Sequence, residues 1–228
     1  MKKLIISFAI VLFGLNTMAV EGKSFLSLRT SFSIALGDYS KNDLDIGCFT
    51  TYGMSFGAEG AWFFWENIGV GLDVNYSLHS VDAIALATEK VRVDQFILDM
   101  TVRSEPYSIL TIMSGFYYSL ELTEKLSLQP KLMGGIMFGK TPYQLYEPTF
   151  FYLGPSYYKV TSSRDYGFAL KTGLLIKYDL SNCIAIGVNA DFTYSHLIFG
   201  FKTAGGNYEN RERNISYLDL GLQLIIKL

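Results

Sequence analysis

The sequence predicts an all-β fold, an eight-stranded antiparallel up-and-down transmembrane β-barrel. Three features support this prediction: segments of alternating apolar and polar residues recur, the connections between them alternate in length, and the last segment, Asn214 to Leu228, alternates throughout. Successive side chains of a strand point to opposite faces, so each segment describes a strand with one apolar and one polar face. The last segment is expected to close the barrel.

The N-terminal segment has the pattern of a secretory signal peptide. Lys2 and Lys3 precede an apolar run from Leu4 to Leu15, and small and polar residues follow as far as Ala19. The apolar run is shorter than the roughly 20 residues that a membrane-spanning helix needs. We expect cleavage after Ala19, with residues 1–19 as the signal peptide and residues 20–228 as the barrel domain.

Composition excludes two other classes of protein. After the signal peptide, no stretch approaches the roughly 18 consecutive apolar residues of a transmembrane helix, although 50% of the chain is hydrophobic. The formal net charge is −2 and becomes −4 without Lys2 and Lys3, which argues against a nucleic-acid partner. Many Tyr, Phe and Gly residues without a long apolar run are typical of alternating membrane strands.

The first three predicted strands span residues 24–36, 51–64 and 68–79. The third is the most regular, with an apolar residue at every second position from Ile68 to Leu78 and small or polar residues between them. The polar faces of the first two carry mainly Gly and Ser, with Arg29 in the first and Glu59 in the second.

The middle two predicted strands span residues 107–120 and 126–139. The second sets Leu126, Leu128 and Leu132 against Gln129 and Lys131. Pro130 interrupts this pattern, because proline cannot donate a hydrogen bond to a sheet in which every strand is paired. A bulge at Pro130 could therefore shift the alternation by one residue.

The last three predicted strands span residues 164–178, 183–199 and 214–228. Each repeats the alternation of large apolar residues with small or polar ones. Lys171, Asp191 and Asp219 lie on their polar faces. The polar faces of the predicted strands therefore consist mainly of Gly, Ser and Asn, with isolated charged residues.

The connections alternate strictly between long and short, as in barrels with short periplasmic turns and longer extracellular loops. Loops 79–106 and 141–163 are the longest. Within the first, Val91 to Val102 also alternates and could be a ninth strand, making ten with one from the second loop. We favour eight strands, with this segment extending a hairpin above the membrane.

Alternation alone does not say which face is inside, and a soluble lipocalin-like barrel would bury its apolar face around a ligand. The small Gly and Ser residues on the polar faces instead suit the narrow interior of an eight-stranded barrel. Trp62, Phe64 and Trp65 gather at one short turn and, with Tyr178, predict an interfacial aromatic girdle. The membrane barrel is the preferred interpretation.

The chain resembles the broad outer-membrane β-barrel domain family of Gram-negative bacteria. The stretches LTEKLSLQPKLMGGIMFG and LGLQLIIKL, the signal peptide and the strand rhythm carry this resemblance. It implies an outer-membrane location, contact with membrane lipid and lipopolysaccharide, a monomeric state, and insertion by the barrel-assembly machinery. That machinery typically recognises a terminal phenylalanine, from which Leu228 departs.

No pattern predicts an enzyme, a cofactor or a metal site. Some small barrels hydrolyse lipids with Ser, His and an acid. Here His79 adjoins Ser80 and His196 adjoins Ser195, but neighbours in a strand face opposite ways and cannot share a proton directly. Both histidines are expected to be ordinary exposed residues near the extracellular rim.

Two non-enzymatic functions remain open from the sequence. In the preferred one, the barrel has a structural or surface-interaction role through its loops, with the aromatic loop Tyr143 to Tyr158 as the candidate surface. In the alternative, it is a narrow conduit or binding barrel for small or apolar solutes, which requires an open lumen or lateral gap.

Several charged residues occupy the alternate strand positions whose side chains point into the barrel, and they predict a network inside the lumen. Arg29, Glu59, Asp73 and Lys131 fall at a similar depth, with Lys171, Asp191 and Asp219 a little higher. Because an isolated buried charge is very costly, we expect these residues to form an interlaced salt-bridge network that plugs the barrel. Otherwise each charge faces lumen water separately.

The two cysteines, Cys48 and Cys183, fall at opposite ends of the predicted barrel. A disulfide requires Cα atoms within roughly 7 Å, so both cysteines are predicted to be free.

Overall fold

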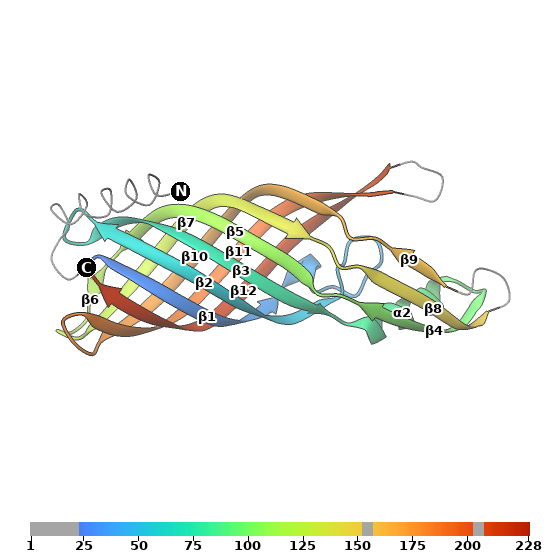
Figure 1. Ribbon diagram of the computed structural model, residues 1–228, viewed down its shortest axis with the longest axis horizontal. Coiled ribbons are helices and arrows are strands. Elements are labelled where there is room, and N and C mark those ends of the chain that lie inside the picture. Colours follow the sequence, from blue (N-terminus) through green and yellow to red (C-terminus); the bar gives the residue numbers. More distant parts are fainter. Residues whose placement is uncertain (1–22, 152–156, 203–207) are drawn as a thin grey trace, which may run out of the picture.

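A computed structural model describes residues 23–151, 157–202 and 208–228. The predicted signal peptide and its cleavage site lie outside the described residues. The described chain forms a closed antiparallel barrel with a smaller extension beyond one end (Figure 1).

Eight strands form the ring, as predicted. Their hydrogen-bonded order is β10-β11-β12-β1-β2-β3-β5-β7, and a further pairing of β7 with β10 closes the sheet. The two-residue strand β6 continues β5 beside the start of β7. The bounds are β1 Phe25–Ala35, β2 Thr50–Phe63, β3 Ile68–Val81, β5 Tyr107–Tyr118, β6 Leu120–Glu121, β7 Leu126–Lys140, β10 Arg164–Asp179, β11 Ile184–Lys202 and β12 Tyr208–Lys227.

The alternation of the sequence places apolar side chains outside the ring and polar ones inside. Leu28, Phe116 and Leu222 are about two-thirds exposed on the outer face, whereas Arg29 is buried. Toward the end with the short turns, called the turn end here, Phe25 and Phe63 fill the interior. The outer face is therefore an apolar belt and the inner face a polar core with an apolar base.

The register is continuous at Pro130, so the bulge considered there is absent. Leu174 of β10 pairs with Pro130, and the β7–β10 register runs unbroken from Leu126 to Lys140. Gln129 and Lys131 remain buried on the inner face. The proline lies where the neighbouring strand is interrupted, between the end of β5 and the start of β6.

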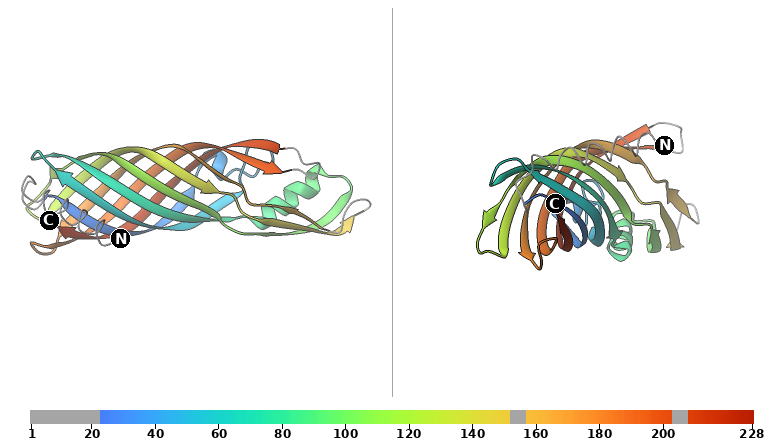
Figure 2. Two further views of the ribbon diagram at one scale, coloured as in Figure 1. Left: turned by 45° about the horizontal axis from the view of Figure 1, so that its top comes forward. Right: turned by 60° about the vertical axis from the view of Figure 1, so that its left-hand side comes forward.

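Beyond the other end, called the loop end here, β4 (Ile97–Ser104), β8 (Gln144–Phe151) and β9 (Tyr158–Val160) form a three-stranded sheet covered by helix α2 (Ala83–Val93). We call these four elements the extension. Figure 2 shows the extension and the β11–β12 hairpin reaching past the same end of the ring, opposite the C-terminus.

The extension corrects and refines the prediction for Val91 to Val102. The first residues of this segment, Val91 to Val93, form the end of helix α2. The N-terminus of the helix is capped by the Asp82 side chain, which accepts a hydrogen bond from the Ala85 N–H at 2.9 Å. Residues 94–96 form a turn, and the segment from Ile97 onward lies in β4, which pairs with β8 and thereby continues the β5–β7 hairpin above the ring. A hairpin extension is therefore confirmed, and a ten-stranded ring is excluded.

Within the described residues, no helix is long and apolar enough to cross a membrane.

Candidate functional site: a charged lumen beneath a loop-end pocket

The structure brings six of the seven predicted lumen charges into one connected set, called the ionic layer. Arg29 of β1 is the centre: its guanidinium lies 2.9 Å from Glu59, 2.8 Å from Asp73 and 2.8 Å from Asp191. Lys131 bridges Glu59 and Asp191 at 2.8 and 3.1 Å, and Lys171 pairs with Asp73. All six side chains are fully buried, so each charge is compensated by protein atoms.

Asp219 lies beside this layer without joining its ion pairs. Its strand position is directly across from Asp191, and its carboxylate accepts a hydrogen bond from Asn75 at 3.3 Å. Neutral side chains complete the layer around Glu59, which also accepts from the Tyr117 hydroxyl at 2.8 Å and from Gln223 at 3.2 Å. These two contacts could have been anticipated, because both residues have inward parity.

An aromatic layer covers the ionic layer on its loop-end side. The 3-10 helix η1 (Gly37–Tyr39) carries Tyr39 into the barrel mouth, where its ring packs edge-on against His79 at 5.3 Å and Tyr107 at 5.5 Å. The Tyr217 ring packs against His79 in a tilted arrangement, with ring centroids 5.0 Å apart. Tyr39, His79 and Tyr217 are fully buried, so the mouth is filled by aromatic rings.

The expectation that both histidines are exposed is wrong for His79. Its ring is buried and hydrogen-bonds the Ser33 hydroxyl at 2.7 Å, because inward parity puts it in the lumen. His196 is exposed, and its Nδ1 lies 2.9 Å from Asn214 Oδ1. Neither histidine is hydrogen-bonded to its neighbouring serine in the described chain.

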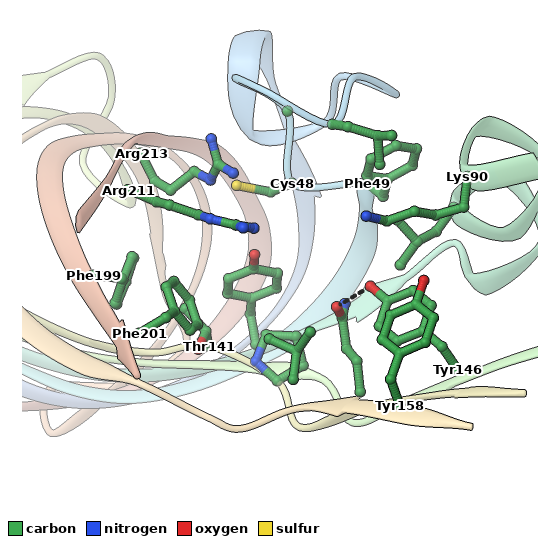
Figure 3. A pocket seen from close by; sticks show the side chains of 17 residues that line it. Cys48, Phe49, Lys90, Thr141, Tyr146, Tyr158, Phe199, Phe201, Arg211 and Arg213 are labelled. Carbon is green, nitrogen blue, oxygen red and sulfur yellow. Dashed lines mark hydrogen bonds between the residues drawn. The ribbon is translucent and has the colours of Figure 1, made fainter. Parts of the chain in front are cut away.

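A pocket of about 250 Å³, the mouth pocket, lies between the aromatic layer and the extension (Figure 3). Three cationic residues line it: Lys90 of α2, and Arg211 and Arg213 of β12. Its wall on the extension side contains Tyr146 and Tyr158. Their rings are stacked, with centroids 4.6 Å apart and an angle of 4° between the ring planes. The remaining lining is mainly apolar or neutral.

Burial shifts the pKa values of three side chains that line the mouth pocket. Burial, and then the nearby Arg211, hold the pKa of Lys90 below its usual value. Burial, and then the adjacent Tyr158, raise the pKa of Tyr146. The pKa of Tyr158 is raised to about 12, chiefly by burial. Both phenols are therefore neutral at physiological pH and add no negative charge to the pocket.

Solved structures share this architecture. A major outer membrane protein from Thermus thermophilus superposes with a TM-score of 0.50 at 9% identity, covering 90% of this chain and 100% of that one. This is the fold of an outer-membrane β-barrel. No protein-family model matches the sequence. No curated protein matches it either.

Two further outer-membrane proteins are similar at lower TM-scores. Ail, the attachment invasion locus protein of Yersinia pestis, has 14% identity and a TM-score of 0.46 over 90% of this chain and 99% of that chain. Neisserial surface protein A has 11% identity and a TM-score of 0.46 over 90% and 97%.

The four residues predicted for the aromatic girdle of this outer-membrane barrel lie near its turn end. Trp62 and Phe64 have ring centroids 5.9 Å apart, and Phe64 and Trp65 have centroids 5.5 Å apart. Phe64, Trp65 and Tyr178 are exposed, whereas Trp62 is partly buried. The assignment of these residues to a membrane interface remains a prediction.

Both cysteines are free, as predicted, with Cys48 buried and Cys183 exposed. Cys48 lines the mouth pocket. Among the described residues, no group of three His, Cys, Asp or Glu side chains could hold a metal ion.

The sequence did not reveal the mouth pocket. Arg211 and Arg213 precede the last predicted strand, which starts at residue 214, yet β12 already begins at Tyr208. The available signal was parity, since both arginines share the inward parity of Tyr217 and Asp219. Tyr39 offered no such signal, because it lies on a turn-rich segment.

Proposed function

We propose that this chain resides in the outer membrane and acts at the cell surface through its extension, while its lumen is closed by the ionic and aromatic layers. In this proposal the barrel is a non-enzymatic anchor that holds the extension outside the cell. The observation that carries it is the fully buried ion-pair layer across the interior of an eight-stranded ring.

Closure of the lumen is supported at three depths. Phe25 and Phe63 fill the turn end, the ionic layer occupies the middle, and Tyr39 fills the mouth. An eight-stranded ring is just wide enough for side chains to fill it. A solute passing through would have to separate charges whose partners are entirely within the protein, which is costly.

Surface action is supported by the construction of the extension. Its small apolar core is formed by Leu86, Met100, Val102 and Tyr146, together with Phe49 from the segment just before β2. Its outer surface exposes large apolar side chains, including Ile84 at 82%. Binding residues are often carried by loops on a rigid scaffold, and here the scaffold is the barrel rim.

A labelling experiment on intact cells tests this location and orientation. Ile84→Cys places a thiol on the extension, and the native Cys183 lies exposed at the turn end. A membrane-impermeant maleimide should label Ile84→Cys in intact cells and should reach Cys183 only after the outer membrane is permeabilised.

The Cys183→Ser background separates the two signals, and it should leave label only on the introduced cysteine. Labelling of Cys183 in intact cells, or recovery of the protein in the soluble periplasmic fraction, would overturn the proposed arrangement.

A further inference from the structure

We propose that the mouth pocket binds a small aromatic carboxylate, with the carboxylate between Lys90 and Arg211 and the ring against the tyrosine wall. This site goes beyond the surface role proposed above, because it assigns a ligand class to one cavity of the protein.

The positive charges that line the pocket favour an anionic ligand. Its lining contains Lys90, Arg211 and Arg213 but no aspartate or glutamate. Figure 3 shows Lys90 and Arg211 reaching toward one another from opposite sides of the cavity. Two cations that face each other repel, and an anion placed between them adds an attraction to each that outweighs this repulsion.

The carboxylates nearby leave these cations available. In the described part of the chain, Lys90 has no ion-pair partner and contacts the Tyr146 ring at 5.8 Å. Arg211 pairs with exposed Glu209 at 2.8 Å, outside the pocket lining. Arg213, which is 8% exposed, donates to the main-chain carbonyl of Asp45 at 2.5 Å.

The apolar part of the lining calls for a ring. Tyr146 and Tyr158 present a stacked aromatic wall beside Lys90, and Arg211 lies over the Phe201 ring at 5.4 Å. Aromatic faces favour offset or edge contacts with another ring. Inorganic phosphate would satisfy the cations but would leave this wall without a partner.

The size and floor of the pocket restrict the ligand further. A volume of about 250 Å³ is slightly below the roughly 300–1,000 Å³ of pockets that hold drug-sized molecules, so the pocket suits one or two rings. Its floor includes Tyr107, which packs on Tyr39 of the aromatic layer. The ligand is therefore bound at a dead end and does not proceed into the lumen.

Isothermal titration calorimetry on the purified full-length barrel in detergent micelles tests this proposal. The probe is 4-hydroxybenzoate, with 4-hydroxybenzamide as its neutral counterpart and inorganic phosphate as an anion without a ring. We expect one molecule of 4-hydroxybenzoate per barrel, bound at least about tenfold more tightly than either comparison compound.

The test variant is the double change Lys90→Gln, Arg211→Gln. The control is Arg92→Gln, because Arg92 lies on helix α2 like Lys90 but outside the pocket lining. The double change should weaken 4-hydroxybenzoate binding at least about tenfold, since it removes both charged donors that face the carboxylate and charge-assisted hydrogen bonds are the strong ones. Arg92→Gln should bind like the parent. Unchanged gel mobility of the unboiled variants would show that the barrel is intact.

Four outcomes would overturn the proposal: no saturable heat with 4-hydroxybenzoate, equal affinity for the benzamide, equal affinity for phosphate, or unchanged affinity in the double variant. Binding of a sulfated oligosaccharide to a barrel that ignores 4-hydroxybenzoate would also overturn it, in favour of a glycan surface.

Discussion

The Glu59 carboxylate accepts hydrogen bonds from both charged and neutral side chains of the lumen. Arg29, Lys131, Tyr117 and Gln223 all donate hydrogen bonds to its carboxylate. Glu59→Ala should lower the temperature at which the unboiled protein changes mobility on a denaturing gel. Removal of one partner from a buried pair costs about 3–5 kcal/mol, because the remaining charges stay buried.

Two matched variants separate charge imbalance from a general effect of substitution. Glu124 lies exposed in the short turn before β7, so Glu124→Ala should behave like the parent. Changing Arg29 and Glu59 together to Gln should be milder than Glu59→Ala, because it removes one charge of each sign. If Glu59→Ala retains the parent's transition temperature, the ionic layer does not stabilise the barrel.

Gly173 lets β10 pass closely behind the ionic layer. A Cβ at this position would lie 1.9 Å from Asp191 Oδ1 and 2.8 Å from Lys131 Cε. Gly173→Ala should therefore displace both charged groups and lower the heat-modification temperature. Gly60→Ala is the control, since its Cβ would meet Leu26 at an ordinary 3.5 Å. Equal transition temperatures for the two variants would contradict the close packing.

The two cysteines should differ in reactivity in the folded protein. Cys183 is exposed, whereas burial raises the pKa of the Cys48 thiol and so lowers its thiolate fraction at neutral pH. Maleimide labelling of folded protein should modify Cys183 much faster than Cys48, and unfolded, unreduced protein should take up two labels. An internal disulfide in the non-reducing mass spectrum would contradict the separation of the two thiols.

At the scale of elements, the extension should be separable in stability from the ring. Leu86 is 4% exposed in the extension core, whereas Ile84 on the same helix is 82% exposed. Leu86→Ala should cost about 2–5 kcal/mol of local stability and speed tryptic cleavage after Lys90, Arg92 and Arg103. Ile84→Ala should digest like the parent.

The heat-modification temperature of Leu86→Ala should stay close to the parent value, because the ring strands do not depend on Leu86. A large fall in that temperature would mean that the ring and the extension unfold as one unit.

The ring could be predicted from the sequence because each membrane strand needs one apolar face, as in Ile68–Val81. Apolar residues therefore recur at every second position along such a strand. Outside the membrane the requirement disappears. The first residues of β12, beginning at Tyr208, are mostly polar, so the apolar alternation marks this strand only from residue 214 onward.

Helix α2 and the β4–β8 pairing were unpredictable for a different reason. The pattern at Val91 to Val93 continued the alternation of the following segment, and only the Asp82 cap marked the helix start. Ser104 of β4 pairs with Gln144 of β8, a contact between two separate loops that no local pattern encodes. The mouth pocket depends on this contact, since it brings Tyr146 beside Lys90.

At the scale of the whole molecule, the same barrel serves two environments through one alternation. Outward residues such as Leu222 meet lipid, and inward residues such as Asp73 meet other charges. The closed ring leaves every ring strand paired on both sides, which explains why the fold should resist detergent until it is heated. The lumen is thus available for stabilising contacts, and the binding proposed above is left to the mouth and the extension.

Single-channel recording in planar bilayers tests the closed lumen most directly. The parent barrel should insert without producing discrete conductance steps, and Glu59→Ala should be the variant that admits small ions, because it removes the carboxylate that holds Arg29 and Lys131 in the ionic layer. Reproducible open steps in the parent, unaffected by Glu59→Ala, would contradict closure by the ionic layer and would favour a conduit.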